Sequence, residues 1–546
     1  MSAKTKYIFV TGGVISGIGK GISVASIGQL LKSQGISVSL QKLDPYLNVD
    51  PGTMSPYQHG EVFVTHDGGE TDLDLGHYER FVDVELTRAS NVTAGQIYSE
   101  VIAKERRGEF LGGTIQIVPH VTNAIKERIK ALTSDQDIDV VVVEVGGTVG
   151  DIEGQPFIEA IRQMRKDVGR DNVFYIHVTL LPDIRATGEI KTKPTQQSVR
   201  ELRGMGIQPD AIICRSDKTV SDSIKEKIAF FCDVEPSAVI ALPTVDTIYE
   251  VPLILQEQGL AVLLAERLDL PIKHNQLKEW EQLVETAKTP SESILIAVVG
   301  KYADLPEAYL SVKEAIFHAG LHHRRNVQIE WIPSESIESE GASTLLSKAS
   351  GIIVPGGFGP RGINGMIQTA TYARENLIPY LGLCLGMQIM VVEFARSVLG
   401  LLQANSTEFA PATPDPVIDL LPDQHGITDM GGTMRLGSYP CQLQANTKAQ
   451  AAYGSTMVEE RHRHRFEVNN NYRESLEKHG LLASGVSPDG TLVEIGEIMN
   501  HPFMVGSQFH PEFRSRPGVP HPLFREFLNV ALQVVHEGTQ HPFPIS

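Results

Sequence analysis

The sequence has few cysteines, no long apolar run and no excess of basic residues. Four cysteines among 546 residues are too few for a disulfide framework, so we expect a reducing, cytoplasmic environment. No apolar run reaches the length of a membrane-spanning helix, and the first residues lack the charged-then-apolar pattern of a signal peptide. The formal net charge of −18 argues against a general nucleic-acid binder, so a phosphate-bearing ligand would need local clusters of basic residues.

The length and composition are those of a soluble globular protein of roughly two to four domains, with 41% hydrophobic and 21% charged residues. Strand and helix patterns alternate on both sides of a polar stretch, Arg267–Ser293, which has the composition of a linker. We therefore expect an α/β fold with two doubly wound domains. The expected boundaries are a first domain over 1–270, a linker over 271–293, a second domain over 294–537 and a disordered tail over 538–546.

The most informative stretch of the first half is Tyr7–Ile22, YIFVTGGVISGIGKGI. Its first residues are apolar, β-branched or aromatic, which is typical of a buried strand. Glycines then allow a tight turn, Lys20 follows, and apolar residues at helical spacing continue to a stop at Gly35. A strand, a glycine-rich turn, a lysine and a helix can cradle phosphate groups, because backbone amides face the anion and the lysine neutralises it.

This stretch departs from the phosphate-loop pattern G-x-x-x-x-G-K-[ST] in two ways. Five residues separate Gly13 from Gly19, and Gly21 stands where a magnesium-binding serine or threonine is expected. The alternative interpretation is a glycine-rich turn that binds nothing. A metal bound here would have to be held by carboxylates from elsewhere in the chain.

Acidic residues that could hold such a metal occur in two places. His66–Arg80 is acidic and punctuated by glycine, and it offers Asp72 and Asp74, although a solvated loop explains this composition equally well. Glu144 lies at the far end of the clearest buried parallel strand of the chain, Asp139–Gly147. Because an unpaired buried charge is costly, we favour a functional role for Glu144 over a packing role.

Basic residues lie at a strand end and in loops. Lys42 is near the end of the predicted strand Ile36–Leu43, at the sheet edge where open α/β folds bind ligands. Lys191–Gln196, KTKPTQ, forms a Lys-x-Lys-Pro turn that could hold a triphosphate, and Lys225 and Lys227 are further cations. Solvated lysines and basic loops are common, so each of these signals is weak alone.

Four segments of the first half together resemble the CTP synthases: GGVISGIGKGI, the long run from QKLDPYLNVD to LDLGHYERF, EVGGTVGDIE and KTKPTQ. The resemblance covers nearly the whole chain. It implies that ATP phosphorylates the 4-oxygen of UTP and that ammonia, taken from glutamine, displaces the phosphate to give CTP in the last step of de novo CTP formation. Phosphoryl transfer of this kind needs positioned positive charge and not a covalent nucleophile.

The resemblance also implies roles for residues of the first half. The residues implied for ATP are Gly17, Ile18, Gly19, Lys20, Gly21, Ile22, Asp74 and Val245. Those implied for UTP, and for CTP as a feedback inhibitor, are Ser16, Asp151, Ile152, Glu153, Lys191, Thr192, Lys193, Pro194, Thr195, Gln196 and Lys227. Asp74 and Glu144 would hold Mg²⁺, and Lys42 would lie near the reacting phosphoryl group and the ammonia path. At Pro243–Val245 the chain has Pro-Thr-Val where the family often has Lys-Asp-Val, so only backbone contacts carry over there.

In the second half, Gly382–Gly386 reads G-L-C-L-G, the form of a nucleophile elbow with cysteine in place of serine. A strand is predicted before Cys384 and a helix after it, which puts the thiol at a helix N-terminus, where the thiolate is favoured. A free cysteine is more often a buried structural residue, the role that we expect for Cys214, Cys232 and Cys441. Glycines on both sides of Cys384 argue against that role for it.

A cysteine nucleophile needs a base that is oriented by a third group. Ser507–Phe513, SQFHPEF, supplies His510 and Glu512 after an apolar run. A single His-x-Glu pair is frequent by chance, but together with G-L-C-L-G it resembles the class I glutamine amidotransferases. That resemblance implies that Cys384 attacks the glutamine amide, that His510 protonates the leaving ammonia and activates water, and that Glu512 orients His510.

The resemblance implies further residues around glutamine and further partners. Backbone N–H groups of Gly357 and Leu385 would form the oxyanion hole, and Phe358 would line the pocket or a gate. The other residues expected at the glutamine site are Gly386, Met387, Gln388, Glu408 and Arg465. The family is usually a homotetramer, a dimer of dimers, that GTP activates, and an internal passage would carry the ammonia to UTP.

The implied fold class is therefore an N-terminal P-loop-type synthetase (amidoligase) domain followed by a C-terminal class I glutamine amidotransferase domain. Two other functions fit part of the pattern. A cobyric-acid-type amidase also joins a phosphate-loop half to a glutaminase-like half, but it would not be expected to carry KTKPTQ together with EVGGTVGDIE. A regulatory or filament-forming ATPase with a vestigial glutaminase is disfavoured by the intact Cys384, His510 and Glu512.

Overall fold

The computed structural model divides the chain into two units. The residues that it describes are 5–133, 137–184, 189–271, 277–289, 292–421, 424, 426–427 and 431–536. The first unit comprises Met1–Asp50 and Asp74–Glu285, and the second comprises Pro51–Leu73 and Thr286–Ser546. The expected tail over 538–546 and two parts of the expected linker, 272–276 and 290–291, lie outside the described residues.

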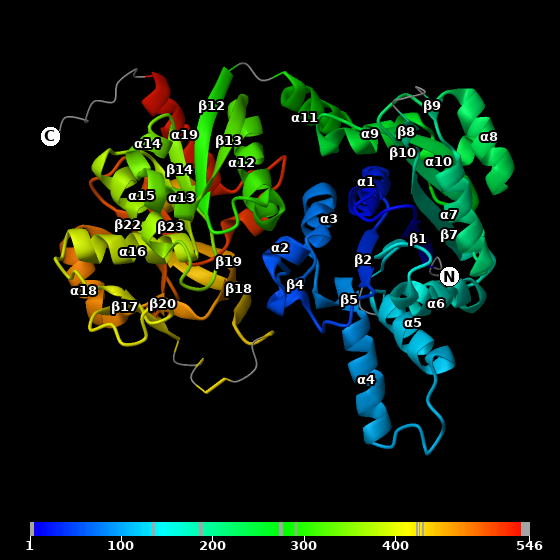
Figure 1. Cartoon of the computed structure of the whole chain (residues 1–546), viewed down its shortest axis with the longest axis horizontal. Coiled ribbons are helices and arrows are strands. Elements are labelled where there is room, and N and C mark those ends of the chain that lie inside the picture. The colour runs from blue at the N-terminus through cyan, green and yellow to red at the C-terminus, as the bar shows by residue number, and fades with distance from the viewer. Residues whose placement is uncertain are drawn as a thin grey trace. The chain divides into compact units, whose positions relative to one another are not determined.

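The first unit is built on a sheet of seven parallel strands in the order β11-β10-β7-β1-β6-β2-β5. Figure 1 labels β1, β2, β5, β7 and β10 of this sheet. The strands are β1 (Lys6–Gly12), β2 (Val38–Asp44), β5 (Asn91–Thr93), β6 (Val140–Val145), β7 (Val173–Leu180), β10 (Ala211–Ser216) and β11 (Val239–Pro243). Every residue of β6 is buried, as is all of β1 after Lys6. Such continuous apolar runs are typical of parallel strands that helices cover on both faces.

Helices alternate with these strands, as the pattern of the sequence predicts. They are α1 (Lys20–Ser33), α3 (Asp74–Val82), α4 (Ala94–Arg106), α5 (Thr122–Ala131), α6 (Gln155–Val168), α7 (Lys193–Gly204), α8 (Asp222–Cys232), α9 (Val251–Glu257) and α10 (Leu260–Leu268). On one face of the sheet, Tyr7 and Phe9 of β1 pack with Val143 of β6, Ile161 of α6 and Tyr175 of β7. The doubly wound α/β prediction is confirmed for this unit.

The second unit has a sheet of nine strands in the order β13-β12-β14-β15-β23-β22-β21-β18-β19. The strands are β12 (Glu292–Gly300), β13 (Arg325–Pro333), β14 (Gly351–Val354), β15 (Tyr380–Leu383), β18 (Arg435–Leu443), β19 (Met457–His464), β21 (Leu481–Val486), β22 (Val493–Ile498) and β23 (Met504–Ser507). The strands from β13 to β23 are parallel, and the pairings from β23 onward are antiparallel. The alternating strand and helix pattern of the sequence does not predict this antiparallel part.

Helices again follow the parallel strands, and a small three-stranded sheet completes the unit. The helices are α11 (Lys278–Lys288), which spans the division between the units, α12 (Leu310–His323), α13 (Ser334–Glu340), α14 (Ala342–Leu346), α15 (Ile363–Glu375), α16 (Leu385–Ser397), α17 (Lys448–Tyr453), α18 (Asn470–Lys478) and α19 (Pro522–His536). The small sheet contains β16 (Asn405–Ser406), β17 (Pro416–Leu420) and β20 (Phe466–Val468). In the part of the chain that the structure describes, no single helix is long and apolar enough to cross a membrane, and one bent pair, Ile248–Glu257 with Leu260–Leu268, meets that test by length and composition only.

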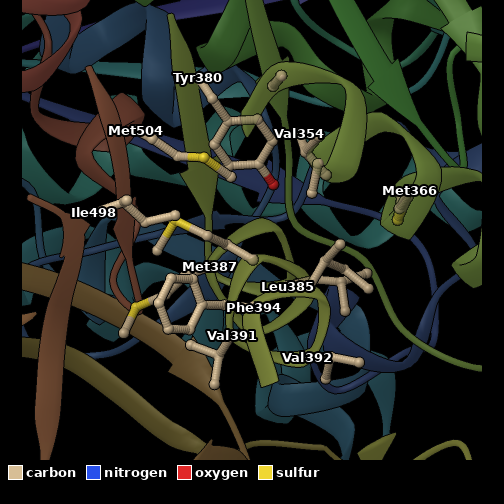
Figure 2. Packing of buried hydrophobic residues seen from close by; sticks show 14 of the residues in the cluster. Val354, Met366, Tyr380, Leu385, Met387, Val391, Val392, Phe394, Ile498 and Met504 are labelled. Atoms are coloured by element: carbon tan, nitrogen blue, oxygen red, sulfur yellow. The ribbon is translucent and has the colours of Figure 1, made fainter. Parts of the chain in front are cut away.

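Helix α16 is buried along most of its length. Every residue from Leu385 to Ala395 is buried. Figure 2 shows Met387 and Phe394 of this helix in one cluster with Met504 of β23. Because the interior of a protein is close-packed, this core fixes the position of the turn that precedes α16.

Residues 51–73 pack in the second unit although they lie within the first half of the sequence. They contain α2 (Pro56–His59), β3 (Phe63–Val64) and β4 (Glu70–Thr71). The carboxylate of Glu61 accepts a hydrogen bond from the backbone N–H of Ser311, in the first turn of α12, at 2.9 Å. Arg461 of β19 donates to the backbone oxygen of Val64 at 3.1 Å. The expected first domain over 1–270 includes this segment, which the structure assigns to the second unit; the other limits of that domain stay a prediction.

Candidate active sites

Cys384 lies in the one-residue turn between β15 and α16, as the sequence predicted. Its backbone has φ 50° and ψ −99°, a conformation that is unfavourable for a residue with a side chain. The backbone N–H of Cys384 donates to the oxygen of Ser507 at 2.7 Å, which ties the turn to the end of β23. Such a strained turn places a nucleophile at the carboxyl ends of the parallel strands.

The glycines on both sides of Cys384 are required by close packing. A Cβ atom at Gly382 would lie 2.6 Å from the carbonyl carbon of Gly386, and one at Gly386 would lie 1.9 Å from the backbone oxygen of Val354. Neither position can accept a side chain without moving backbone. The two glycines of G-L-C-L-G are therefore explained by the close backbone contacts of the turn.

His510 and Glu512 form a buried pair beside this cysteine. The distance from His510 Nδ1 to Glu512 Oε1 is 2.7 Å, and the ring of His510 stacks on Phe513. Burial would lower the pKa of His510, but the charges of Glu512 and Cys384 more than offset this effect and raise the pKa to about 10. An imidazolium beside a thiol is the arrangement that activates a cysteine nucleophile.

Polar groups surround the sulfur of Cys384. Gln508 donates from Nε2 to the sulfur at 3.6 Å, and the thiol donates to the backbone oxygen of Arg463 at 3.9 Å. Gln388, a predicted glutamine contact, donates to Gln508 Oε1 at 3.3 Å and to the backbone oxygen of Phe466 at 3.1 Å. Gln388 therefore contacts Gln508, which in turn contacts the sulfur of Cys384.

A cavity of about 110 Å³ opens at Cys384 and His510. Cys384, His510, Gly357 and Phe358 line it together with residues of the 51–73 segment. Gly357 lines this cavity, and the N–H of Leu385 belongs to the first turn of α16, whose amides have no acceptor within the helix; their role as oxyanion donors stays a prediction. The structure brings these predicted residues into one place.

Other predicted glutamine residues lie differently. Glu408 accepts a hydrogen bond from the N–H of Gly359 at 2.7 Å, and burial raises the pKa of Glu408. The side chain of Met387 packs in the core, so only its backbone can face a ligand (Figure 2). Arg465 donates to Gln424 at 2.6 Å and to Thr433 at 2.7 Å. Among the described residues, Arg463 and not Arg465 lines the cavity.

No motif in the sequence singles out Arg463 or its partner Glu70. Arg463 Nε and Glu70 Oε1 are 2.8 Å apart, the side chain of Glu70 is 1% exposed, and the guanidinium lies 5.1 Å from the ring centre of Phe358. Phe63, in the same segment as Glu70, packs edge-on against Phe513. The alternation of side chains along a strand could have indicated that Arg463 lies on the same face as Arg465, but nothing local indicates that Glu70 is its partner.

In the first unit, Lys20 begins α1 after a turn in which Gly17 and Gly19 have φ of 67° and 90°. Lys20 Nζ donates to the backbone oxygen of Gly147 at 2.7 Å. A Cβ atom at Gly12 would lie 2.6 Å from Cδ of Lys20, so the lysine side chain runs back over the end of β1. Burial lowers the pKa of Lys20, and nearby carboxylates, first that of Glu144, oppose this.

Lys42, Asp74 and Glu144 meet beside this turn. Lys42 of β2 is in register with Glu144 of β6, and its Nζ contacts the carboxylate of Asp74 and lies 3.7 Å from Glu144 Oε1. Tyr78 donates a hydrogen bond to the other oxygen of Glu144. Burial raises the pKa of Glu144 to about 7; Lys42 lowers it and Asp74 adds to the rise. The predicted position of Lys42 beside the glycine turn is confirmed.

Gly21 explains the departure from the phosphate-loop pattern. A Cβ atom at this position would lie 2.0 Å from Oδ1 of Asp74, so the carboxylate fills the space that a serine or threonine side chain would occupy. Asp72, the other acidic candidate, lies in the second unit, where it pairs with His59 at 3.3 Å. No group of three or more metal-ligating side chains occurs among the described residues. Two convergent carboxylates fit Mg²⁺, which uses one or two together with phosphate oxygens.

The residues expected at UTP come from several segments of the first unit. In KTKPTQ, Lys191 pairs with Glu189, Thr195 donates to Thr179 at 3.1 Å, and Lys193 lies 5.6 Å from the ring centre of Phe231. Among the described residues, no hydrogen bond or ion pair joins Asp151, Ile152 or Glu153 to this segment. Lys227 does lie near it, because its charge, after the hydrogen bond from Lys191, lowers the pKa of Glu189. Ser16, Ile18, Ile22 and Val245 likewise remain predictions.

Two family models match the chain: that of the CTP synthase N-terminus over residues 6–270 and that of the class-I glutamine amidotransferases over residues 304–530. A CTP synthase of Dehalococcoides mccartyi is 64% identical over 542 residues, which cover 99% of this chain and all of the relative. A CTP synthase of Roseiflexus sp. (strain RS-1) is 64% identical over 541 residues, which cover 99% and 97%. The solved glutaminase domain of Trypanosoma brucei CTPS with bound acivicin is 37% identical, covers 44% of this chain and 94% of its own, and gives a TM-score of 0.41.

The two sites fall one in each matched range. Lys20 and Glu144 lie in the synthase range, and Cys384 and His510 lie in the amidotransferase range. The identity to the two bacterial relatives extends over nearly the full length of all three chains. The chain therefore belongs to the CTP synthase family and is a glutamine-dependent enzyme that converts UTP to CTP with ATP as co-substrate.

Proposed function

We propose that glutamine is hydrolysed at the second-unit site by a Cys-His-Glu mechanism. The sulfur of Cys384 attacks the side-chain carbonyl carbon of glutamine, and the carbon–nitrogen bond breaks as His510 gives its proton to the leaving ammonia. Water activated by His510 then cleaves the thioester, which releases glutamate and restores the thiol. Glu512 holds the ring of His510 in place. The observation that carries this proposal is the buried His510–Glu512 pair beside the strained Cys384 turn.

The transition state of each step carries a negative oxygen. We assign its stabilisation to the backbone N–H groups of Gly357 and Leu385, since one such donor typically contributes about 10²–10³ in rate. Binding of the substrate's amino and carboxylate ends is assigned to Gln388, Glu408 and Arg465, with Gly386 and Met387 contributing backbone groups.

The first unit would activate UTP. The turn from Gly17 to Ile22 would wrap the ATP phosphates, with Val245 near the adenine and Lys20 on the phosphoryl group that moves to the 4-oxygen of UTP. Asp74 and Glu144 would hold Mg²⁺, which neutralises phosphate charge when bound. Lys42 supplies a further cation beside both carboxylates. Ammonia then displaces the phosphate and gives CTP.

The remaining nucleotide residues are assigned to UTP, and to CTP as a feedback inhibitor. We assign them as Ser16, Asp151–Glu153, Lys191–Gln196 and Lys227. The resemblance to the CTP synthases supports a homotetramer in which neighbouring subunits build the nucleotide site. We also propose that GTP activates the enzyme and that an internal passage carries the ammonia to UTP. A cytoplasmic location is proposed because all four cysteines are buried and free of disulfides.

The variant Cys384→Ala tests the division of labour. It should abolish CTP formation from glutamine and leave CTP formation from ammonium chloride at the wild-type rate, measured by the absorbance change on conversion of UTP to CTP. Cys441→Ala, which removes another buried cysteine of the same unit, should retain both activities. If Cys384→Ala still uses glutamine, the cysteine mechanism is wrong.

A further inference from the structure

Lys301 is a buried cation that the mechanism above does not use. It directly follows β12, and it is 1% exposed. Among the described residues, no carboxylate lies within ion-pair distance of its ammonium. Burying a charge is costly unless hydrogen bonds replace its water, so the partners of this lysine indicate what it does.

Those partners are backbone oxygens of the loop between β14 and α15, residues 355–362. Lys301 Nζ donates to the oxygen of Gly359 at 2.6 Å and to the oxygen of Arg361. The N–H of Gly359 donates to Glu408 Oε1 at 2.7 Å. A cation and an anion thus hold the two polar groups of one residue, Gly359, whose φ of 79° suits glycine.

The same loop lies against the catalytic pair. A Cβ atom at Gly357 would lie 2.9 Å from Cδ of Lys301, so the lysine stem passes directly beneath this residue. A Cβ atom at Gly356 would lie 3.0 Å from Cε1 of His510 and 3.7 Å from Cβ of Cys384. The loop is therefore packed between the buried lysine and the catalytic residues, and it carries the N–H of Gly357.

We propose that Lys301 is a positioning residue for glutamine hydrolysis, which holds the 355–362 loop so that the N–H of Gly357 faces the oxygen of the glutamine carbonyl attacked by Cys384. This inference rests on the proposed glutaminase mechanism. Lys301 touches no reacting atom. It acts through the loop, and an oxyanion donor must be placed within a few tenths of an ångström to be effective.

The ionisation of Lys301 gives the proposal a pH signature. Burial lowers the pKa of Lys301 to about 8, and the carboxylate of Glu408 opposes this effect only in part. The other charged or titratable groups that face Lys301 or its backbone are Arg361, Glu335, Glu338 and Tyr57. A neutral amine forms weaker hydrogen bonds to carbonyl oxygens than an ammonium does. Glutamine hydrolysis should therefore decline above about pH 8, while ammonia-dependent synthesis should show no decline of this origin.

The test compares Lys301→Met with the wild type and with Lys313→Met, which removes an exposed lysine of α12. For Lys301→Met we expect kcat for glutamine-dependent CTP formation to fall by about tenfold or more, with KM for glutamine changed by less than about threefold. CTP formation from ammonium chloride should stay at the wild-type rate. Alkylation of Cys384 by iodoacetamide needs no oxyanion donor, so its rate should also be unchanged. Lys313→Met should match the wild type in all four measurements.

Two results would overturn the proposal. One is wild-type kcat with glutamine in Lys301→Met; the other is a loss of alkylation in proportion to the loss of hydrolysis, which would place the effect on the thiol. If Lys301→Met also loses ammonia-dependent synthesis, it is misfolded, and Lys301→Arg is then the deciding variant. The guanidinium of Lys301→Arg stays charged, so the decline of glutamine-dependent synthesis above pH 8 should disappear. An unchanged decline in this variant contradicts the proposal. Failure of the glutaminase mechanism itself would be seen separately, as glutamine use by Cys384→Ala.

Discussion

Replacing Gly21 by alanine would put one methyl group where the Asp74 carboxylate now lies. The added Cβ atom would be 2.0 Å from Oδ1 and 2.4 Å from Cγ of Asp74. Ordinary contact begins at 3.4 Å, so the carboxylate must move by about 1 Å or more. Since Lys42 is paired with the same carboxylate, the movement would disturb the whole charged cluster beside Lys20.

The expected loss is large because positioning is what this site supplies. A displacement of about 1 Å at a reacting centre can cost about 10²-fold in rate. We therefore expect Gly21→Ala to lower ammonia-dependent CTP formation by about 10²-fold and to raise the Mg²⁺ concentration needed for half-maximal rate. Asp74 would still be present, but it would no longer converge with Glu144.

The assay is CTP formation from UTP, ATP and ammonium chloride at a series of Mg²⁺ concentrations. Gly204→Ala is the matched control, because this glycine at the end of α7 has open space around the added atom. It should match the wild type. If Gly21→Ala keeps the wild-type rate and Mg²⁺ requirement, Asp74 does not act from its present position and our explanation of the missing serine or threonine is wrong.

Two further predictions concern buried polar groups. Glu70→Gln removes the charge that pairs with Arg463 at 2.8 Å, and breaking a buried ion pair typically costs about 3–5 kcal/mol. Glutamine-dependent synthesis should therefore fall about tenfold or more relative to ammonia-dependent synthesis, whereas Glu340→Gln, at an exposed position, should change neither rate. An unchanged ratio of the two rates in Glu70→Gln would show that the pair does not belong to the site. His177 is fully buried, and burial, with a smaller effect of Lys20, lowers its pKa to about 3, against about 6.5 in the unfolded chain. Its contribution to the free energy of unfolding is therefore complete above pH 6.5. As the pH falls from 6.5 toward 3, this contribution is lost at about 1.4 kcal/mol per pH unit. Urea unfolding at pH 6 and pH 5 should therefore show a smaller loss of stability for His177→Gln than for the wild type, and equal losses would contradict this assignment.

The sequence predicted those features that depend on neighbouring residues. The strands Tyr7–Thr11 and Asp139–Gly147 and the elbow around Cys384 are local patterns of apolar residues and glycines, and each lies within two residues of the observed element. Their signal is local because their physical cause is local: a buried parallel strand is continuously apolar, and the elbow admits only glycine on both sides of its nucleophile.

The features that the sequence did not predict depend on contacts between distant residues. Nothing around Lys301 indicates that its ammonium binds carbonyl oxygens of residues 359 and 361, and nothing around Glu70 indicates a partner in β19. The antiparallel strands β22, β21, β18 and β19 were not predicted for a related reason. Several carry buried charged residues, such as Glu494, that are satisfied only by other strands, so their pattern is not that of an apolar strand.

The 51–73 segment shows how far such contacts change the domain description. Its last residue, Leu73, is followed directly by Asp74, which begins α3 and belongs to the charged cluster of the first unit. The same short segment supplies the carboxylates that cap α12 and pair with Arg463 in the second unit. A chain cut at residue 294 would leave the N–H of Ser311 without the Glu61 carboxylate and the partly buried guanidinium of Arg463 without Glu70. The composition of the linker identifies where the chain passes between two sheets, but the segment that lines the cavity together with Cys384 begins more than two hundred residues earlier.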